Sequence, residues 1–123
     1  MRELSATARD HFVHPRHTGD LDADQPGVIT VRAEVPTSGE ILQLQLCVND
    51  QGVIAETRFK AYGCGWLIAC GSLLTERIAG LTLADAGRFR HHELVQRLTV
   101  PPEKLHCAVL AETVLQTALR SLT

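Results

Sequence analysis

The feature that most constrains the fold of this chain is a set of three segments in which side-chain character alternates along the sequence, joined by very short connections. Residues 28–35, 41–48 and 53–60 are rich in β-branched and apolar residues, and turn-forming segments at 36–39 and 49–52 separate them. Connections this short predict an antiparallel meander of three strands. The middle run presents Leu42, Leu44, Leu46 and Val48 on one face and Gln43, Gln45 and Cys47 on the other. The third presents Val53, Ala55, Thr57 and Phe59 on one face.

The rest of the chain has helical periodicity. A short amphipathic helix is expected at residues 3–13, where Pro15 stops it. After residue 65 the spacing of apolar residues predicts helices at 66–79, 83–89, 91–98 and 103–119, and Gly80 suits the position just beyond the first of them. Strands followed by helices predict an α+β fold with the helices packed on one face of the sheet. The length fits a single domain over residues 1–123.

Composition narrows the classes of function. The formal net charge of −2 indicates no strong attraction to nucleic acid or to a membrane surface. The sequence has no apolar run of membrane-spanning length, and its N-terminus lacks a secretory core, so a cytoplasmic protein is expected. In that compartment its four cysteines are expected to be thiols or metal ligands instead of disulfides. No Ser/His/Asp order, phosphate loop or paired carboxylates indicate an enzyme in its own right.

Two cysteines lie where loops are expected to enter helices. Cys64 follows the third strand between two glycines, and Cys107 opens the last helix just after His106. Backbone N–H groups and the helix dipole at such junctions favour a thiolate. Thiolate and imidazole are ligands for zinc, iron and iron–sulfur clusters. Both cysteines also have a purely structural interpretation. Cys64 could be a small buried residue at a tight turn, and Cys107 could be a core cysteine next to a histidine that caps the helix.

Other residues could join such a site. Glu40 could complete a metal site, although a solvated loop glutamate is the simpler interpretation of the residue alone. Lys104 could lower the pKa of nearby thiols, or lie on the surface. Cys70 falls on the apolar face of a predicted helix, which indicates core packing, and Cys47 has no obvious partner.

Four motifs in order resemble the iron–sulfur cluster assembly scaffolds of the IscU and NifU N-terminal type. Residues 14–19 (H-P-R-H-T-G) resemble the family's N-P-R-N-x-G loop, and residues 48–52 (V-N-D-Q-G) its V-N-D-x-G hairpin. Residues 58–65 (R-F-K-A-Y-G-C-G) are close to R-F-K-x-Y-G-C-G, and residues 101–107 (P-P-E-K-L-H-C) to P-P-x-K-x-H-C. The resemblance extends from about residue 6 to 119 and implies a SufE/NifU-like fold.

The resemblance implies a site and a set of partners. The family assembles a [2Fe–2S] cluster on three cysteines beside an aspartate and a histidine, with sulfur delivered as a persulfide by a cysteine desulfurase. Cys64 and Cys107 match two of the cysteines, and His106 and Lys104 match the histidine and a lysine. A frataxin-like protein and recipient apo-proteins are further implied partners.

The chain departs from the family at the first ligand cysteine. Where the family has A-C-G-D, residues 37–40 read T-S-G-E, so that Ser38 replaces the cysteine and Glu40 the aspartate. A serine hydroxyl gives up its proton much less readily than a thiol and is a harder donor. Weaker cluster binding is therefore expected. Rescue by Cys70 is not expected, because it lies more than one helical turn beyond Cys64.

A second departure affects chaperone recognition. The family's chaperone-recognised segment usually reads L-P-P-V-K, and residues 100–104 read V-P-P-E-K. Glu103 in place of the central apolar residue predicts poor binding to a dedicated Hsp70-type chaperone.

Three hypotheses follow. In the first, the protein is a variant scaffold in which Cys107 accepts persulfide sulfur, Lys104 supports it by charge, and Glu40, Cys64 and His106 hold iron or zinc together with Cys107. In the second, it is a sulfur-acceptor or regulatory module of the same fold that builds no cluster. In the third, it is a small protein with structural zinc.

Overall fold

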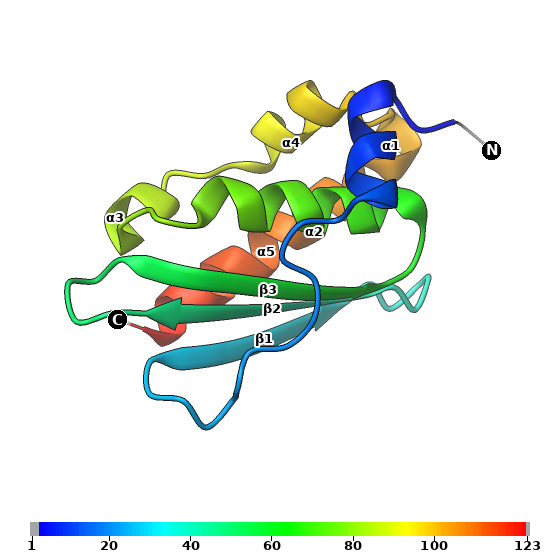
Figure 1. Cartoon of the computed structure of the whole chain (residues 1–123). Coiled ribbons are helices and arrows are strands. Elements are labelled where there is room, and N and C mark those ends of the chain that lie inside the picture. Colours follow the sequence, from blue (N-terminus) through cyan, green and yellow to red (C-terminus); the bar gives the residue numbers. More distant parts are fainter. Residues whose placement is uncertain (1–2, 123) are drawn as a thin grey trace.

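The computed structural model describes residues 3–122 and contains a three-stranded sheet with helices against it (Figure 1). The elements in chain order are α1 (Ala6–Val13), β1 (Val28–Glu34), β2 (Ile41–Val48), β3 (Ile54–Tyr62), α2 (Gly65–Ile78), α3 (Leu83–Ala86), α4 (His91–Leu98), the 3₁₀ turn η1 (Pro102–Lys104) and α5 (Leu105–Ser121). The strands pair antiparallel in the order β1-β2-β3. The predicted α+β class and meander are confirmed.

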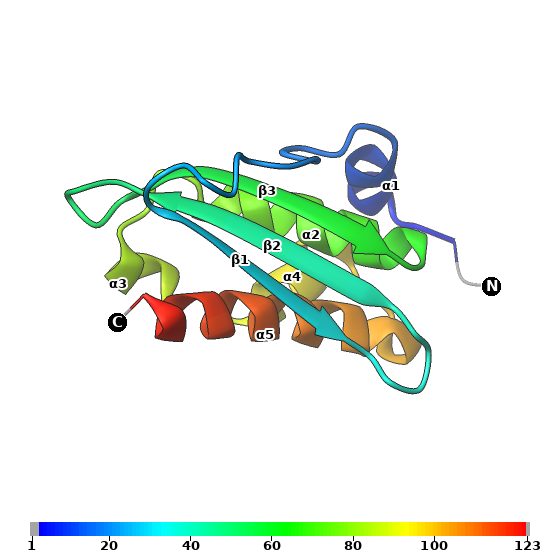
Figure 2. The same ribbon diagram turned by 90° about the horizontal axis from the view of Figure 1, so that it is seen from below.

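The helices α2 and α5 lie on the same side of the sheet (Figure 2). Between them and the sheet lies a core that includes Leu42, Leu44, Leu46, Leu67 and Leu115, each at most 1% exposed. The apolar face predicted for β2 is therefore the core face. Its opposite face is also partly covered, because the Gln45 amide oxygen accepts a hydrogen bond from the Leu21 N–H at 2.7 Å.

The prediction that Val53 and Ala55 share one face of β3 with Thr57 and Phe59 was wrong. The pairing of β2 with β3 shifts between Cys47 and Val48, so that Cys47 lies opposite Glu56 while Val48 lies opposite Ile54. The extra residue in β3 is Ala55, which is exposed, whereas Ile54 is buried. A β-bulge of this kind breaks strict alternation, which periodicity alone could not reveal.

The segment between α1 and β1 runs along the outer edge of β3 (Figure 1). The Phe59 N–H donates to the His17 carbonyl at 2.9 Å, and the Gly19 N–H donates to the Phe59 carbonyl at 3.2 Å. These bonds satisfy backbone groups that an open strand edge would leave exposed. In α1, which precedes this segment, His11 is buried and its Nδ1 lies 2.7 Å from the hydroxyl of Ser72 in α2. This hydrogen bond holds α1 against α2.

Helix ends follow local chemistry. Ser5 caps α1 by accepting the Ala8 N–H, so the helix begins at residue 6 and not at residue 3. Beyond α2, Gly80 has the left-handed φ of +87° that was expected of it. The predicted third helix is shorter, ending at residue 86, and the last begins with η1 before α5. Within residues 3–122 no helix has the length and apolar character needed to cross a membrane.

Candidate functional site

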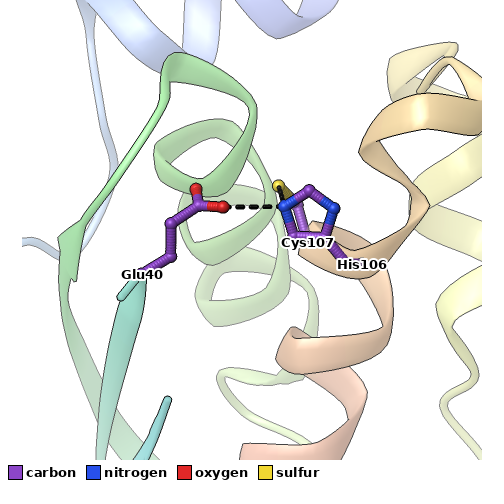
Figure 3. Close-up of side chains that lie close together, drawn as sticks. All are labelled: Glu40, His106 and Cys107. Carbon is purple, nitrogen blue, oxygen red and sulfur yellow. Dashed lines mark hydrogen bonds and ion pairs between the residues drawn. The ribbon is translucent and has the colours of Figure 1, made fainter. Parts of the chain in front are cut away.

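Three segments that are distant in sequence meet at one end of the sheet. Glu40 immediately precedes β2, Cys64 is the N-cap of α2, and His106 and Cys107 lie in the first turn of α5. The start of β2 lies next to the end of β3, because Ile41 pairs with Tyr62. This pairing brings Glu40 near Cys64. The packing of α5 adds His106 and Cys107, which lie beside Glu40 (Figure 3).

Glu40 connects the three segments. Its Oε1 lies 2.7 Å from His106 Nε2, and its Oε2 accepts the Cys64 backbone N–H at 3.1 Å. The side chain of Glu40 is only 12% exposed. Burial alone raises the pKa of this carboxyl, but the hydrogen bonds from Cys64 and His106 outweigh burial and lower the pKa to about 2. Glu40 is therefore a carboxylate at neutral pH, with both oxygens engaged.

The two thiols are in contact. Cys64 Sγ lies 3.7 Å from Cys107 Sγ, and Cys107 Sγ lies 3.6 Å from His106 Nε2. Their surroundings differ, because Cys107 is 0% exposed whereas Cys64 is partly exposed. The side chains thus form a continuous chain from a carboxylate through an imidazole to a buried and then an accessible thiol.

The environment favours a thiolate at only one of the two cysteines. The hydrogen bond from Cys107, with a further one from the Leu67 N–H at the start of α2, lowers the pKa of Cys64 to about 6 against the opposing effects of burial and Glu40. The same hydrogen bond, together with burial, raises the pKa of Cys107. The sequence indicated a thiolate at both junctions, but the contact between the thiols leaves the proton on Cys107.

The donor atoms suit a metal ion. A carboxylate oxygen of Glu40, a ring nitrogen of His106 and the sulfur of Cys107 lie within 4.8 Å of one another. Cys64 is not part of this group of three, but its Sγ lies 3.7 Å from Cys107 Sγ and is placed to supply a fourth donor beside it. One oxygen, one nitrogen and two sulfur donors match the sets that tetrahedral zinc and iron–sulfur centres accept.

The remaining candidate residues fall outside this chain of contacts. Ser38 lies at its edge, with its hydroxyl 3.2 Å from Glu40 Oε1. Lys104 lies in η1 and, within residues 3–122, forms no hydrogen bond or ion pair with either thiol. Cys70 is 0% exposed, and burial raises its pKa to about 12, which fits the predicted core role. Cys47 is buried, with its sulfur 3.9 Å from the Pro26 carbonyl oxygen.

One contributor to this geometry was missed in the sequence. Gly63 has no side chain, and a Cβ at this position would lie 2.5 Å from Glu40 Oε2. Glycine therefore allows the carboxylate to reach the Cys64 N–H. The G-C-G pattern was interpreted only as freedom around the cysteine, and nothing in it indicated which side chain would occupy the space.

Comparison with known proteins adds a family relationship. The sequence model of the protein family described as NifU-like N terminal domain matches residues 4–123 of this chain. The iron–sulfur cluster assembly scaffold protein IscU of Azotobacter vinelandii is 43% identical over 111 residues, which cover 90% of this chain and 87% of the relative. The protein of the same name from Escherichia coli K12 is 38% identical over 110 residues, covering 89% and 86% of the two chains.

Solved structures have the same architecture. A candidate iron–sulfur cluster assembly scaffold protein for the SUF system of Fervidobacterium islandicum superposes with a TM-score of 0.75 at 19% identity, covering 94% of this chain and 95% of the other. The N-terminal part of a NifU-like protein from Brucella abortus gives a TM-score of 0.60 at 18% identity, covering 94% and 80%. At such identities the likeness concerns the fold alone.

Proposed function

Because the chain belongs to the family of NifU-like N-terminal domains, we propose that it is a variant iron–sulfur cluster assembly scaffold. The observation that carries the proposal is the contact of Cys64 with Cys107, beside the hydrogen bond between His106 and Glu40. Glu40 and Cys64 are 24 positions apart in the sequence, and Cys64 and Cys107 are 43 positions apart. These residues come from segments of different secondary structure and still meet in one place. A purely structural role would not require four potential metal-ligand residues in one continuous chain of contacts.

In this proposal Cys107 is the residue on which persulfide sulfur supplied by a cysteine desulfurase is finally held. Glu40, Cys64 and His106 hold iron, together with Cys107, while the [2Fe–2S] cargo forms. Recipient apo-proteins take the cluster, and a frataxin-like protein is a further partner. Lys104, at the start of the same helix, contributes positive charge near the site without contacting the thiols.

Anaerobic reconstitution tests the proposed function. The folded protein is incubated with ferrous iron, a cysteine desulfurase and cysteine, and visible and Mössbauer spectra are recorded. We expect the signature of a [2Fe–2S] cluster in the wild type and its loss in the Cys107→Ser variant. A Cys47→Ser control should behave like the wild type, because Cys47 lies near Pro26 and away from the site. Folded wild-type protein that takes up no cluster would refute the scaffold function.

A second function is favoured by the missing thiol. With Ser38 in place of a cysteine, the oxygen, nitrogen and two sulfur donors suit one tetrahedral zinc ion. Zinc retained through purification without chelator, together with no cluster on reconstitution, would support a zinc-binding protein. Persulfide on the protein without either metal would support a sulfur-acceptor or regulatory module.

The loop before α5 should bind a dedicated Hsp70-type chaperone poorly. Pro101 is buried whereas Glu103 is exposed, so the residue that departs from the family pattern is accessible to a partner. A pocket that binds an apolar side chain loses about 1.5–3 kcal/mol of binding free energy when that side chain is absent, and the Glu103 carboxylate adds a desolvation cost. In a fluorescence titration we expect a peptide of residues 98–107 to bind roughly tenfold or more weakly than its Glu103→Val counterpart. Equal affinities would contradict this.

A further inference from the structure

The difference in exposure between the two contacting thiols has a consequence for sulfur transfer. Cys107 is 0% exposed, and the Cys64 thiol and the His106 ring both contact its sulfur. A persulfide carried by another protein cannot reach a thiol that has no accessible surface. Cys64, in contrast, is partly exposed, and the flanking Gly63 and Gly65 place no side chain beside it.

We propose that Cys64 is the entry thiol of a two-cysteine relay, receiving persulfide sulfur at the surface and passing it to Cys107. This inference rests on the proposed function, in which Cys107 is the final sulfur acceptor. It gives Cys64 a role in transfer in addition to metal binding.

Both steps of the relay are thiol exchanges without net oxidation. In the first, the Cys64 thiolate attacks the outer sulfur of a donor persulfide, so that a new S–S bond forms on Cys64 and the donor leaves as a thiolate. In the second, Cys107 Sγ attacks that outer sulfur, the bond to Cys64 Sγ breaks, and the proton that Cys107 held passes to the departing Cys64 sulfur. One sulfur atom moves, and no reductant is consumed.

The geometry permits the second step. The transferred sulfur lies roughly 2 Å from Cys64 Sγ, as in any S–S bond. Cys107 Sγ is 3.7 Å from Cys64 Sγ. Attack on the transferred sulfur must come in line with the bond to Cys64 Sγ, from about 3–3.5 Å, which requires the two Sγ atoms to be roughly 5 Å apart. A rotamer change that moves the partly exposed Cys64 side chain outward by little more than about 1 Å would bring the three sulfur atoms into line.

The test uses the metal-free full chain and cysteine persulfide as donor, with samples alkylated at intervals. Trypsin separates the two thiols, because cleavage after Lys60, Arg77, Lys104 and Arg120 places Cys64 in peptide 61–77 and Cys107 in peptide 105–120. Fragment spectra distinguish Cys64 from Cys70 in the first peptide. Serine is a good N-cap, so the Cys64→Ser variant should keep α2, and circular dichroism checks its fold.

In the wild type the added sulfur should be found first on Cys64 and then on Cys107. The Cys107→Ser variant should retain it on Cys64, and the Cys64→Ser variant should load Cys107 about a hundredfold more slowly, because the positioned intermediate is lost. The Cys47→Ser control should match the wild type.

The relay would be overturned if the Cys64→Ser variant acquired sulfur on Cys107 at the same rate as the wild type. The absence of sulfur on both thiols would also overturn it, as would a Cys64–Cys107 disulfide with released sulfide instead of a Cys107 persulfide. The scaffold function is judged separately by reconstitution. A cluster formed without the relay refutes only the relay, whereas a relay without any cluster refutes only the scaffold function.

Discussion

Replacing Ser38 by cysteine should raise the affinity for iron and the yield of reconstituted cluster by at least about tenfold, since even the loss of groups that only support metal ligands costs 10–100-fold in affinity. The site already contains two thiols in contact. The Ser38 hydroxyl lies 3.2 Å from Glu40 Oε1, so the side chain at this position points toward the other ligands. A thiol there supplies a softer donor than a hydroxyl and ionises far more readily.

The measurement is the absorbance and Mössbauer intensity of the cluster per protein chain after anaerobic reconstitution. Ser38→Ala is the matched control, because it removes the hydroxyl without adding a thiol, and it should behave like the wild type. An unchanged yield in a folded Ser38→Cys variant would show that the missing thiol does not limit cluster binding.

Replacing Glu40 by glutamine should weaken both the metal site and the fold. Glutamine has nearly the same shape but no charge, so the hydrogen bond between the carboxylate and His106 is lost, while a carbonyl oxygen can still accept the Cys64 N–H. Loss of a carboxylate ligand should lower affinity for zinc or iron by at least about tenfold, since the loss of groups that only support ligands already costs 10–100-fold. Competition with a chromophoric chelator measures this, and Glu34→Gln, at an exposed position on β1, is the control.

The same variant gives a dependence of stability on pH in metal-free protein. The pKa of Glu40 is lowered from 4.5 to about 2 in the folded state. A lowered carboxyl pKa stabilises the fold above the unfolded value of 4.5, and this contribution is lost as the pH falls from 4.5 toward about 2. The shift corresponds to on the order of 3 kcal/mol at pH 7.

Unfolding by urea, followed through the fluorescence of the single tryptophan, Trp66, measures this contribution. The wild type should exceed Glu40→Gln in free energy of unfolding at neutral pH, and the two should converge in acid. Parallel curves across this pH range would exclude a stabilising charge on Glu40.

Most elements of the fold were predictable because their signals are local. The alternation in residues 41–48 and the turn residues on either side predicted β2 with its observed bounds, and the helix at 91–98 was likewise predicted as observed. The bulge at Ala55 was not predictable, since it arises from how two strands pair and not from either strand alone.

The sequence by itself determined which chemistry the chain could carry. Cysteine at two loop-to-helix junctions, histidine beside one of them and serine in place of a third cysteine are properties of single positions. The tertiary structure decided how these groups act on one another. Only the packing of α5 against the sheet and α2 sets Cys107 against Cys64 and pairs His106 with Glu40. That packing leaves the proton on the buried Cys107 thiol and leaves the partly exposed Cys64 thiol accessible to a partner, because pKa and accessibility depend on neighbours that are distant along the chain.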